Sequence, residues 1–163
     1  MTHEHSITLR AATVDDVPLV LRFIRELADY ERLAHEVTAT EEQLRATLFG
    51  PRPCAEVALA FMADEPVGYA LFFTSYSTFL AKPGIYLEDL FVSLAARGRG
   101  VGKALLAHVA RLAVDRDCGR LEWSALNWNA PAIGFYKSLG AEAKDEWTIY
   151  RLKGDALAEL ARG

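Results

Sequence analysis

The sequence is poor in cysteine, in net positive charge and in long apolar runs. Cys54 and Cys118 are its two cysteines, far apart and without a Cys-x-x-Cys spacing, so we expect neither a disulfide framework nor a metal site. Eighteen basic residues against 22 acidic ones give a net charge of −4, which argues against nucleic acid as a partner and favours a cationic small molecule. No apolar run is long enough to span a bilayer, so no membrane partner is expected.

The N-terminal segment Met1–His5 has neither the basic region nor the apolar stretch that opens a secretory signal peptide. We therefore expect a cytoplasmic protein whose two cysteines are reduced. The length of 163 residues is that of one ordinary domain, and a hydrophobic fraction of 52% is enough for a sizeable core. The sequence predicts a single globular domain over residues 1–163.

The first half of the chain carries the signals of two helices and four strands. We predict a strand near Ile7–Arg10 and a helix from Thr13 to about Tyr30, with apolar residues at helical spacing. A second helix follows Thr40, which forms a capping box with Gln43. Three strands are expected next, the first two joined by a turn at Asp64-Glu65-Pro66: Glu56–Ala63, Val67–Thr74 and Ile85–Val92.

The second half is predicted to alternate helices and strands. The expected elements are a helix from about Val101 to Asp117, a strand over Arg120–Ala125, a helix over Ala130–Ser138 that ends at Gly140, a strand over Trp147–Leu152 and a short C-terminal helix. The predicted order is therefore βααβββαβαβα, without an internal repeat. This alternation predicts an α/β protein with a mixed sheet.

The loop Arg97–Gly102 reads Arg-Gly-Arg-Gly-Val-Gly and opens a predicted helix. A P-loop here would need Ser or Thr at Ala104, and a dinucleotide fingerprint would need a small residue at Lys103. The remaining pattern, Arg-x-x-Gly-x-Gly, lets consecutive N–H groups turn toward an anion, aided by the helix dipole and by the charges of Arg97 and Arg99. The loop alone is equally consistent with an ordinary turn before a helix.

The wider sequence resembles the GNAT superfamily of N-acetyltransferases, in which Gln/Arg-x-x-Gly-x-Gly/Ala lies between a central strand and a helix. The segment Asn127–Ala141 is similar to the second cofactor motif of that superfamily. A closer similarity, to the diamine (spermidine/spermine) branch, rests on Leu27–Glu31, Tyr86–Val92 and Trp128–Pro131. This resemblance covers most of the chain and implies the GNAT fold, acetyl-CoA as co-substrate and no metal.

The resemblance also implies two catalytic residues. Only about one alkylammonium in a thousand is neutral at pH 7, so the reaction needs a proton acceptor. Glu88 is expected to contact the amine or relay its proton through water, and Tyr136 to protonate the departing CoA sulfur. An ion pair at Glu88 and a half-buried aromatic at Tyr136 are the structural alternatives. Because neighbouring strand residues face opposite sides, only one of Glu88 and Asp89 should line the site, and the resemblance favours Glu88.

Three segments are implied to bind the cofactor, and the end of the first helix to bind the amine. An aromatic face beside a carboxylate suits an alkylammonium, although an exposed helix end is the alternative for Tyr30 and Glu31. The expected cofactor contacts are the backbone of Leu90, Phe91 and Val92, then Arg97, Gly98, Arg99, Gly100, Val101, Gly102 and Lys103, then Asn129, Pro131, Ala132 and Lys137. The expected substrate contacts are Tyr30, Glu31, Glu88 and Asp89.

We therefore expect an acetyl-CoA-dependent N-acetyltransferase of a small primary amine: a polyamine, a diamine or an amino acid such as thialysine. Direct transfer in a ternary complex is favoured, because the sequence has no Gly-x-Ser-x-Gly elbow. The branch usually has an acidic residue where this chain has Ala130, so polyamine specificity stays open. The alternatives are a protein or peptide N-acetyltransferase and a non-catalytic CoA-binding regulatory domain. A homodimer is expected by analogy with the superfamily.

Overall fold

The computed structural model describes residues 6–163, so the expectation drawn from Met1–His5 lies outside the described residues. The chain divides into two compact units, one ending at Ser124 and the other spanning Ala125–Gly163. That the two units together form a single domain over residues 1–163 stays a prediction.

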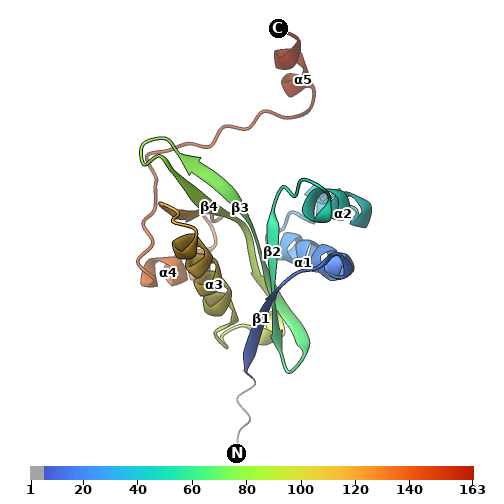
Figure 1. The fold of residues 1–163 in the computed structure, drawn as a ribbon, viewed down its shortest axis with the longest axis vertical. Coiled ribbons are helices and arrows are strands. Elements are labelled where there is room, and N and C mark those ends of the chain that lie inside the picture. Colours follow the sequence, from blue (N-terminus) through green and yellow to red (C-terminus); the bar gives the residue numbers. More distant parts are fainter. Residues whose placement is uncertain (1–5) are drawn as a thin grey trace, which may run out of the picture. The chain divides into compact units, whose positions relative to one another are not determined.

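The first unit is built on a five-stranded mixed sheet with the strand order β1-β2-β3-β4-β5 (Figure 1). The pairs β1–β2, β2–β3 and β3–β4 are antiparallel, and β5 pairs with β4 in parallel. This arrangement confirms the predicted α/β class with a mixed sheet. The strands are β1 (Ile7–Ala11), β2 (Glu56–Met62), β3 (Glu65–Ser77), β4 (Lys82–Val92) and β5 (Leu121–Trp123).

Helices cover both faces of this sheet. Figure 1 shows α1 and α2 on one side and α3 on the other. None of the helices in residues 6–163 is both long and apolar enough to cross a membrane. The helices are α1 (Val17–Tyr30), α2 (Glu41–Phe49) and α3 (Val101–Asp115), with 3-10 turns at Val14–Asp16, Ala34–Glu36 and Leu94–Ala96.

The main core lies between α1, α2 and the face of the sheet that they cover. The predicted apolar stripe of α1 is confirmed, since Val17, Val20 and Leu21 are buried. Phe23 is buried as well, and its ring stacks on that of Tyr69 with centroids 5.5 Å apart and planes 4° apart. Burying such a side chain stabilises the fold by about 1.5–3 kcal/mol, so this stack anchors α1 on the sheet.

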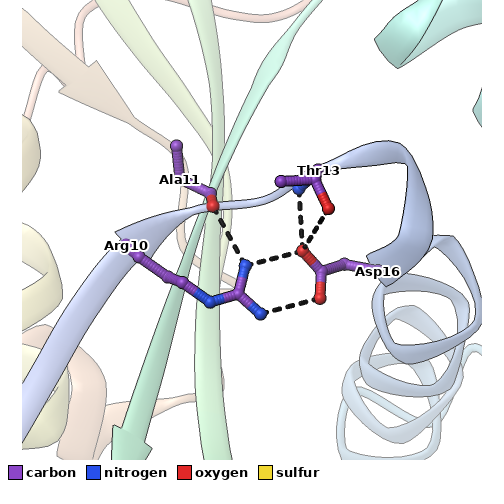
Figure 2. Close-up of polar contacts among 4 residues, drawn as sticks. All are labelled: Arg10, Ala11, Thr13 and Asp16. Atoms are coloured by element: carbon purple, nitrogen blue, oxygen red, sulfur yellow. Dashed lines mark hydrogen bonds and ion pairs between the residues drawn. The ribbon is translucent and has the colours of Figure 1, made fainter.

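An ion pair joins β1 to the start of α1 (Figure 2). The Arg10 guanidinium donates to both oxygens of Asp16, at 2.7 and 2.8 Å, and the Thr13 N–H donates to Oδ2 of Asp16 at 2.7 Å. The hydrogen bond from Arg10 is the main cause that lowers the pKa of Asp16 to about 2. Asp16 therefore stays ionised at neutral pH. Its carboxylate accepts hydrogen bonds from Arg10 and from the Thr13 N–H, just before the helix begins.

The second predicted helix is confirmed together with its cap. The Gln43 N–H donates to Oγ1 of Thr40 at 3.2 Å, and the Thr40 N–H donates to Oε1 of Gln43 at 3.0 Å. This exchange satisfies two backbone donors that would otherwise lack partners at the helix start. Leu44 and Leu48, four residues apart on one face of the helix, are buried.

The turn between β2 and β3 lies one residue earlier than predicted. Ala63 and Asp64 form it, both with positive φ, of 48° and 66°. Two consecutive residues with positive φ form a tight two-residue hairpin turn, whose twist matches that of the flanking strands. Because the turn ends at Asp64, β3 begins at Glu65. Pro66 lies in that strand next to an irregularity in its pairing with β2, a register shift between Ala60 and Phe61. Proline is tolerated there because the regular ladder of hydrogen bonds is interrupted.

The second unit, as described, holds two helices: α4 (Ala130–Ser138) and α5 (Gly154–Arg162). The predicted α4 is confirmed, with Gly140 at φ 87° just after its end. The predicted strand Trp147–Leu152 is wrong, since that segment is irregular and its apolar side chains are exposed. A strand needs a neighbour for its N–H and C=O groups, and no strand of the described second unit supplies one.

Candidate active site

A β-bulge interrupts β4 at Glu88. Leu71 of β3 lies opposite Asp89 and Phe72 lies opposite Leu87, so Glu88 has no opposite residue. Because consecutive residues of β3 face opposite sides of the sheet, Leu87 and Asp89 do so as well. Asp89 shares the face of Leu71, which packs against the core under α1 and α2. The bulge thus turns a carboxylate toward the side of the sheet that carries α1, whose end is predicted to bind the amine.

The Asp89 carboxylate is tied to a buried tyrosine of β3. Tyr69 is 0% exposed, and its hydroxyl donates to Oδ2 of Asp89 at 2.7 Å. Burial raises the pKa of Asp89, the Tyr69 hydrogen bond lowers it in part, and the nearby charge of Glu88 raises it again. Burial, followed by the charge of Asp89, raises the pKa of Tyr69 well above its ordinary value. Tyr69 is therefore a hydrogen-bond donor at neutral pH.

A third carboxyl group comes from the end of α1. Glu31 caps that helix, with its N–H donating to the Leu27 carbonyl at 2.9 Å. Burial raises the pKa of Glu31, and the charge of Asp89 raises it further. Asp89 therefore lies within electrostatic reach of Glu31 and of Glu88, and these are three of the four predicted substrate residues. A cation among these side chains would relieve their mutual repulsion and favour their charged forms.

Arg97 takes an unexpected position. Its guanidinium carbon lies 4.1 Å from the ring centroid of Tyr30 and 5.6 Å from that of Phe91. Its Nε donates to the Val92 carbonyl at 3.0 Å. Cation–π contacts of this kind hold a guanidinium against aromatic faces. The side chain predicted to add charge to the cofactor loop thus links the end of α1 to β4, while Arg99 stays exposed in the loop.

The geometry of the glycine loop fits a diphosphate. Gly98 and Gly100 have φ of 74° and 86°, in the left-handed region that favours glycine. Gly100 is the N-cap of α3 and contributes no side-chain cap, so the first N–H groups of the helix are available to an anion together with the positive end of its dipole. Lys103 is exposed in the first turn of α3. These residues would hold the diphosphate of CoA.

The outer edge of β4 fits the next part of an extended cofactor. β5 pairs with β4 over Ile85–Leu87, whereas β4 continues to Val92. Beyond Leu87, none of the described strands pairs with this edge. Main-chain groups of Leu90, Phe91 and Val92 therefore lie where an extended ligand could pair with the strand, as the pantetheine arm is expected to do.

The remaining predicted residues lie on α4 of the second unit. Asn129 is the N-cap of this helix, and Pro131 stands in its first turn, where its missing N–H costs nothing. Ala132 and Tyr136 are four residues apart and share one face of the helix. Tyr136 is half-buried, with its ring centroid 5.7 Å from that of Phe135, and Lys137 is exposed.

Sequence reasoning missed Tyr69. It follows Gly68 in an apolar strand, where an aromatic residue is typical of a core. The available signal was its hydroxyl, because a buried phenol needs a hydrogen-bond partner. Asp89, in the next strand, is the partner that the register supplies, but that register depends on the bulge and is not visible in the sequence.

The sequence matches a known family over most of its length. A protein-family profile described as the Acetyltransferase (GNAT) family matches residues 21–141. The thialysine N-epsilon-acetyltransferase of Bos taurus is 40% identical over 95% of this chain and 97% of its own length. The L-ornithine N5-acetyltransferase of Arabidopsis thaliana is 34% identical over 97% of this chain and 89% of its own length.

Two further comparisons concern the branch and the fold. The spermidine/spermine N(1)-acetyltransferase-like protein 1 of Homo sapiens is 28% identical over 94% of this chain, which covers 23% of that protein. Among solved structures, an integron cassette protein from the mobile metagenome of V. cholerae has a TM-score of 0.81 and 32% identity, covering 97% of this chain and 99% of its own. These matches confirm the fold class that the motifs predicted.

Proposed function

Because this chain belongs to the GNAT family and is an N-acetyltransferase of small-molecule amines near the polyamine branch, we propose that its acceptor is the terminal primary amine of a small amino acid. Acetyltransferases of this family use acetyl-CoA as co-substrate, which supplies the acetyl group as a thioester. The observation that carries the proposal is the group of carboxylates formed by Glu31, Glu88 and Asp89. A cluster of like charges at a partly buried position suits an alkylammonium.

The names of two relatives narrow the class of amine. One relative acts on thialysine and another on ornithine, and both compounds are amino acids with a primary amine at the end of the side chain. In the proposed complex the acidic side chains of Glu31 and Asp89 neutralise the charge of the amine, beside the Tyr30 ring, which carries the Arg97 guanidinium. Such a site favours a short cationic chain over a neutral acceptor.

In the proposed reaction Glu88 receives the proton that the amine must lose. At the bulge Glu88 has no opposite residue on β3, and its side chain is exposed. These features allow it to take the proton directly or through one water molecule. The freed nitrogen lone pair then forms the new bond to the acetyl carbon as the carbon–sulfur bond breaks.

Tyr136 is the proposed general acid. Its hydroxyl would donate a proton to the sulfur as that atom leaves, and the second proton that the nitrogen loses on becoming an amide would restore the hydroxyl. Phenols have an ordinary pKa of about 10, which suits an acid for a departing thiolate. The N–H groups at the start of α3 would hold the diphosphate, and the β4 edge would orient the arm that carries the acetyl group. Each of these residues acts by binding, orienting or moving a proton, in one ternary complex.

The proposed function is tested by measuring free thiol release from acetyl-CoA with a panel of acceptors. We expect thialysine or ornithine to give a kcat/KM at least about tenfold above that of a lysine-containing peptide or a peptide N-terminus, because a compact acidic site discriminates against a bulky backbone. Spermidine tests the polyamine alternative within the same panel. Faster release with the peptides would support a protein acetyltransferase instead, and tight CoA binding without release for any amine would contradict the proposal.

We further propose that the protein is a homodimer. The C-terminal unit carries a run of large apolar side chains, Trp147, Ile149 and Tyr150, that no described element of that unit buries. Exposed apolar residues at this density are typical of a surface that another chain covers. Light scattering at micromolar concentration is expected to give twice the mass of one chain. A single-chain mass at every concentration tested would contradict the dimer.

We also propose that the enzyme works in the cytoplasm. Cys54 is exposed and Cys118 is partly buried, and both are free thiols. Free thiols of this kind persist in a reducing compartment. The proposed co-substrate and the cysteine usage are thus consistent with one location.

A further inference from the structure

We propose that Tyr69 is a positioning residue for the acetyl transfer, holding the Asp89 carboxylate in the orientation that receives the substrate ammonium group. The proposal rests on the proposed function, because it assigns a task to a second carboxylate of the same site. It adds to the site a residue from the buried interior of the sheet, one strand away from Glu88.

The geometry shows how Tyr69 could act through Asp89. Its hydroxyl occupies Oδ2 of Asp89 at 2.7 Å and leaves Oδ1 for a ligand. The ring itself cannot reorient, because Tyr69 is 0% exposed and stacks on Phe23 with planes 4° apart. A donor fixed by a rigid core selects one rotamer of its acceptor, and that selection lowers the entropy lost when the amine binds.

The bulge explains why Asp89 needs such a partner. At Glu88 the ladder between β3 and β4 is interrupted, so the strand holds the following side chain less firmly than a regular ladder would. The register shift also turns Asp89 inward, where a carboxylate without a donor would be costly to ionise. The Tyr69 hydroxyl supplies that donor at the position where the backbone is irregular.

The charged groups around Asp89 are known from each neighbouring element. Glu88 precedes it on β4, Glu31 approaches from the end of α1, and Tyr69 reaches it from β3, two residues before the residue opposite Asp89. The cation Arg97 is engaged with the rings of Tyr30 and Phe91 and with the Val92 carbonyl. Among these groups, the Tyr69 hydroxyl is the one that lowers the pKa of Asp89 by a hydrogen bond.

The test is Tyr69→Phe, which removes the hydroxyl and keeps the stacked ring. Loss of the donor raises the pKa of Asp89, so the ionised form appears at higher pH. We expect the acidic limb of the kcat/KM profile for the amine to move up by about one pH unit and the KM for the amine to rise about tenfold near that limb. The KM for acetyl-CoA should change less than twofold.

Tyr86→Phe is the matched control. Tyr86 lies on β4 and its hydroxyl shares a hydrogen bond of 2.7 Å with Ser124 and not with Asp89. This variant also loses a tyrosine hydroxyl from the sheet, and its acidic limb should coincide with that of the wild type. Urea unfolding of both variants shows whether either effect comes from a loss of stability.

Two readouts separate positioning from a purely structural role. In a double-mutant cycle, Tyr69→Phe should have almost no further effect on the amine KM once Asp89→Asn is present, because the two residues act as one unit. Carbon-13 NMR of labelled aspartate, with the Asp89 signal identified by its loss in Asp89→Asn, should show the pKa of Asp89 about one unit higher in Tyr69→Phe.

An unchanged pKa of Asp89 in an active Tyr69→Phe enzyme, or additive effects in the cycle, would overturn the role of Tyr69 alone. A wild-type protein that releases no thiol with any amine would instead overturn the proposed function, and the substrate role of Asp89 with it. The NMR titration needs no turnover, so the two failures are distinguishable.

Discussion

Tyr136→Phe is expected to lower kcat for acetyl transfer at least about 100-fold while the Kd for acetyl-CoA stays within about twofold of the wild-type value. The reason is that general acid catalysis contributes about 10²–10⁴ to a rate, and the substitution removes the proton but keeps the ring beside Phe135. Steady-state thiol release gives kcat, and calorimetry gives the Kd. The loss should appear in kcat and in kcat/KM alike, since the proton is donated only in the transition state.

Tyr76→Phe is the control for this variant. Tyr76 lies on β3 with 63% of its surface exposed, so its hydroxyl should make no difference to turnover. Unchanged kcat in Tyr136→Phe would end the general-acid role. A large increase in the Kd for acetyl-CoA would reassign Tyr136 to cofactor binding.

Glu88→Gln is expected to lower kcat/KM for the amine about 100-fold at pH 7, and the deficit should shrink as the pH approaches 10. A base matters most when only about one amine in a thousand is neutral, and it matters little once the solvent has removed the proton. The measurement is the pH profile of kcat/KM for both enzymes with the same amine. The two profiles should converge at alkaline pH.

The alternative role for Glu88 is anchoring of the ammonium group. In that case Glu88→Gln would raise KM, leave kcat near the wild-type value and show no convergence at alkaline pH. Glu65→Gln, at the exposed start of β3, controls for the loss of one surface charge. A profile for Glu88→Gln that coincides with that of the wild type would exclude both roles.

The fold was largely predictable because its signals are local. The capping box of Thr40 and Gln43 and the apolar stripe of α1 depend on residues close together in the sequence, and both are found in the structure. The strand predicted at Trp147–Leu152 was not found, since strand formation depends on a neighbour supplied by another part of the chain. The hairpin turn lies one residue earlier than predicted, because the side-chain types of Ala63 and Asp64 do not encode their positive φ angles.

In the candidate site, too, some features depend on residues close in the sequence and others on contacts between distant parts of the chain. The sequence by itself determined the family, the loop whose glycines adopt left-handed conformations, and the presence of acids at Glu88 and Asp89, because these follow from residue type and spacing. The tertiary structure alone decided which way each acid faces, since one bulge reverses the alternation of side chains along β4. It also decided that Tyr69 holds Asp89, because a hydrogen bond between strands depends on register, which no local pattern encodes.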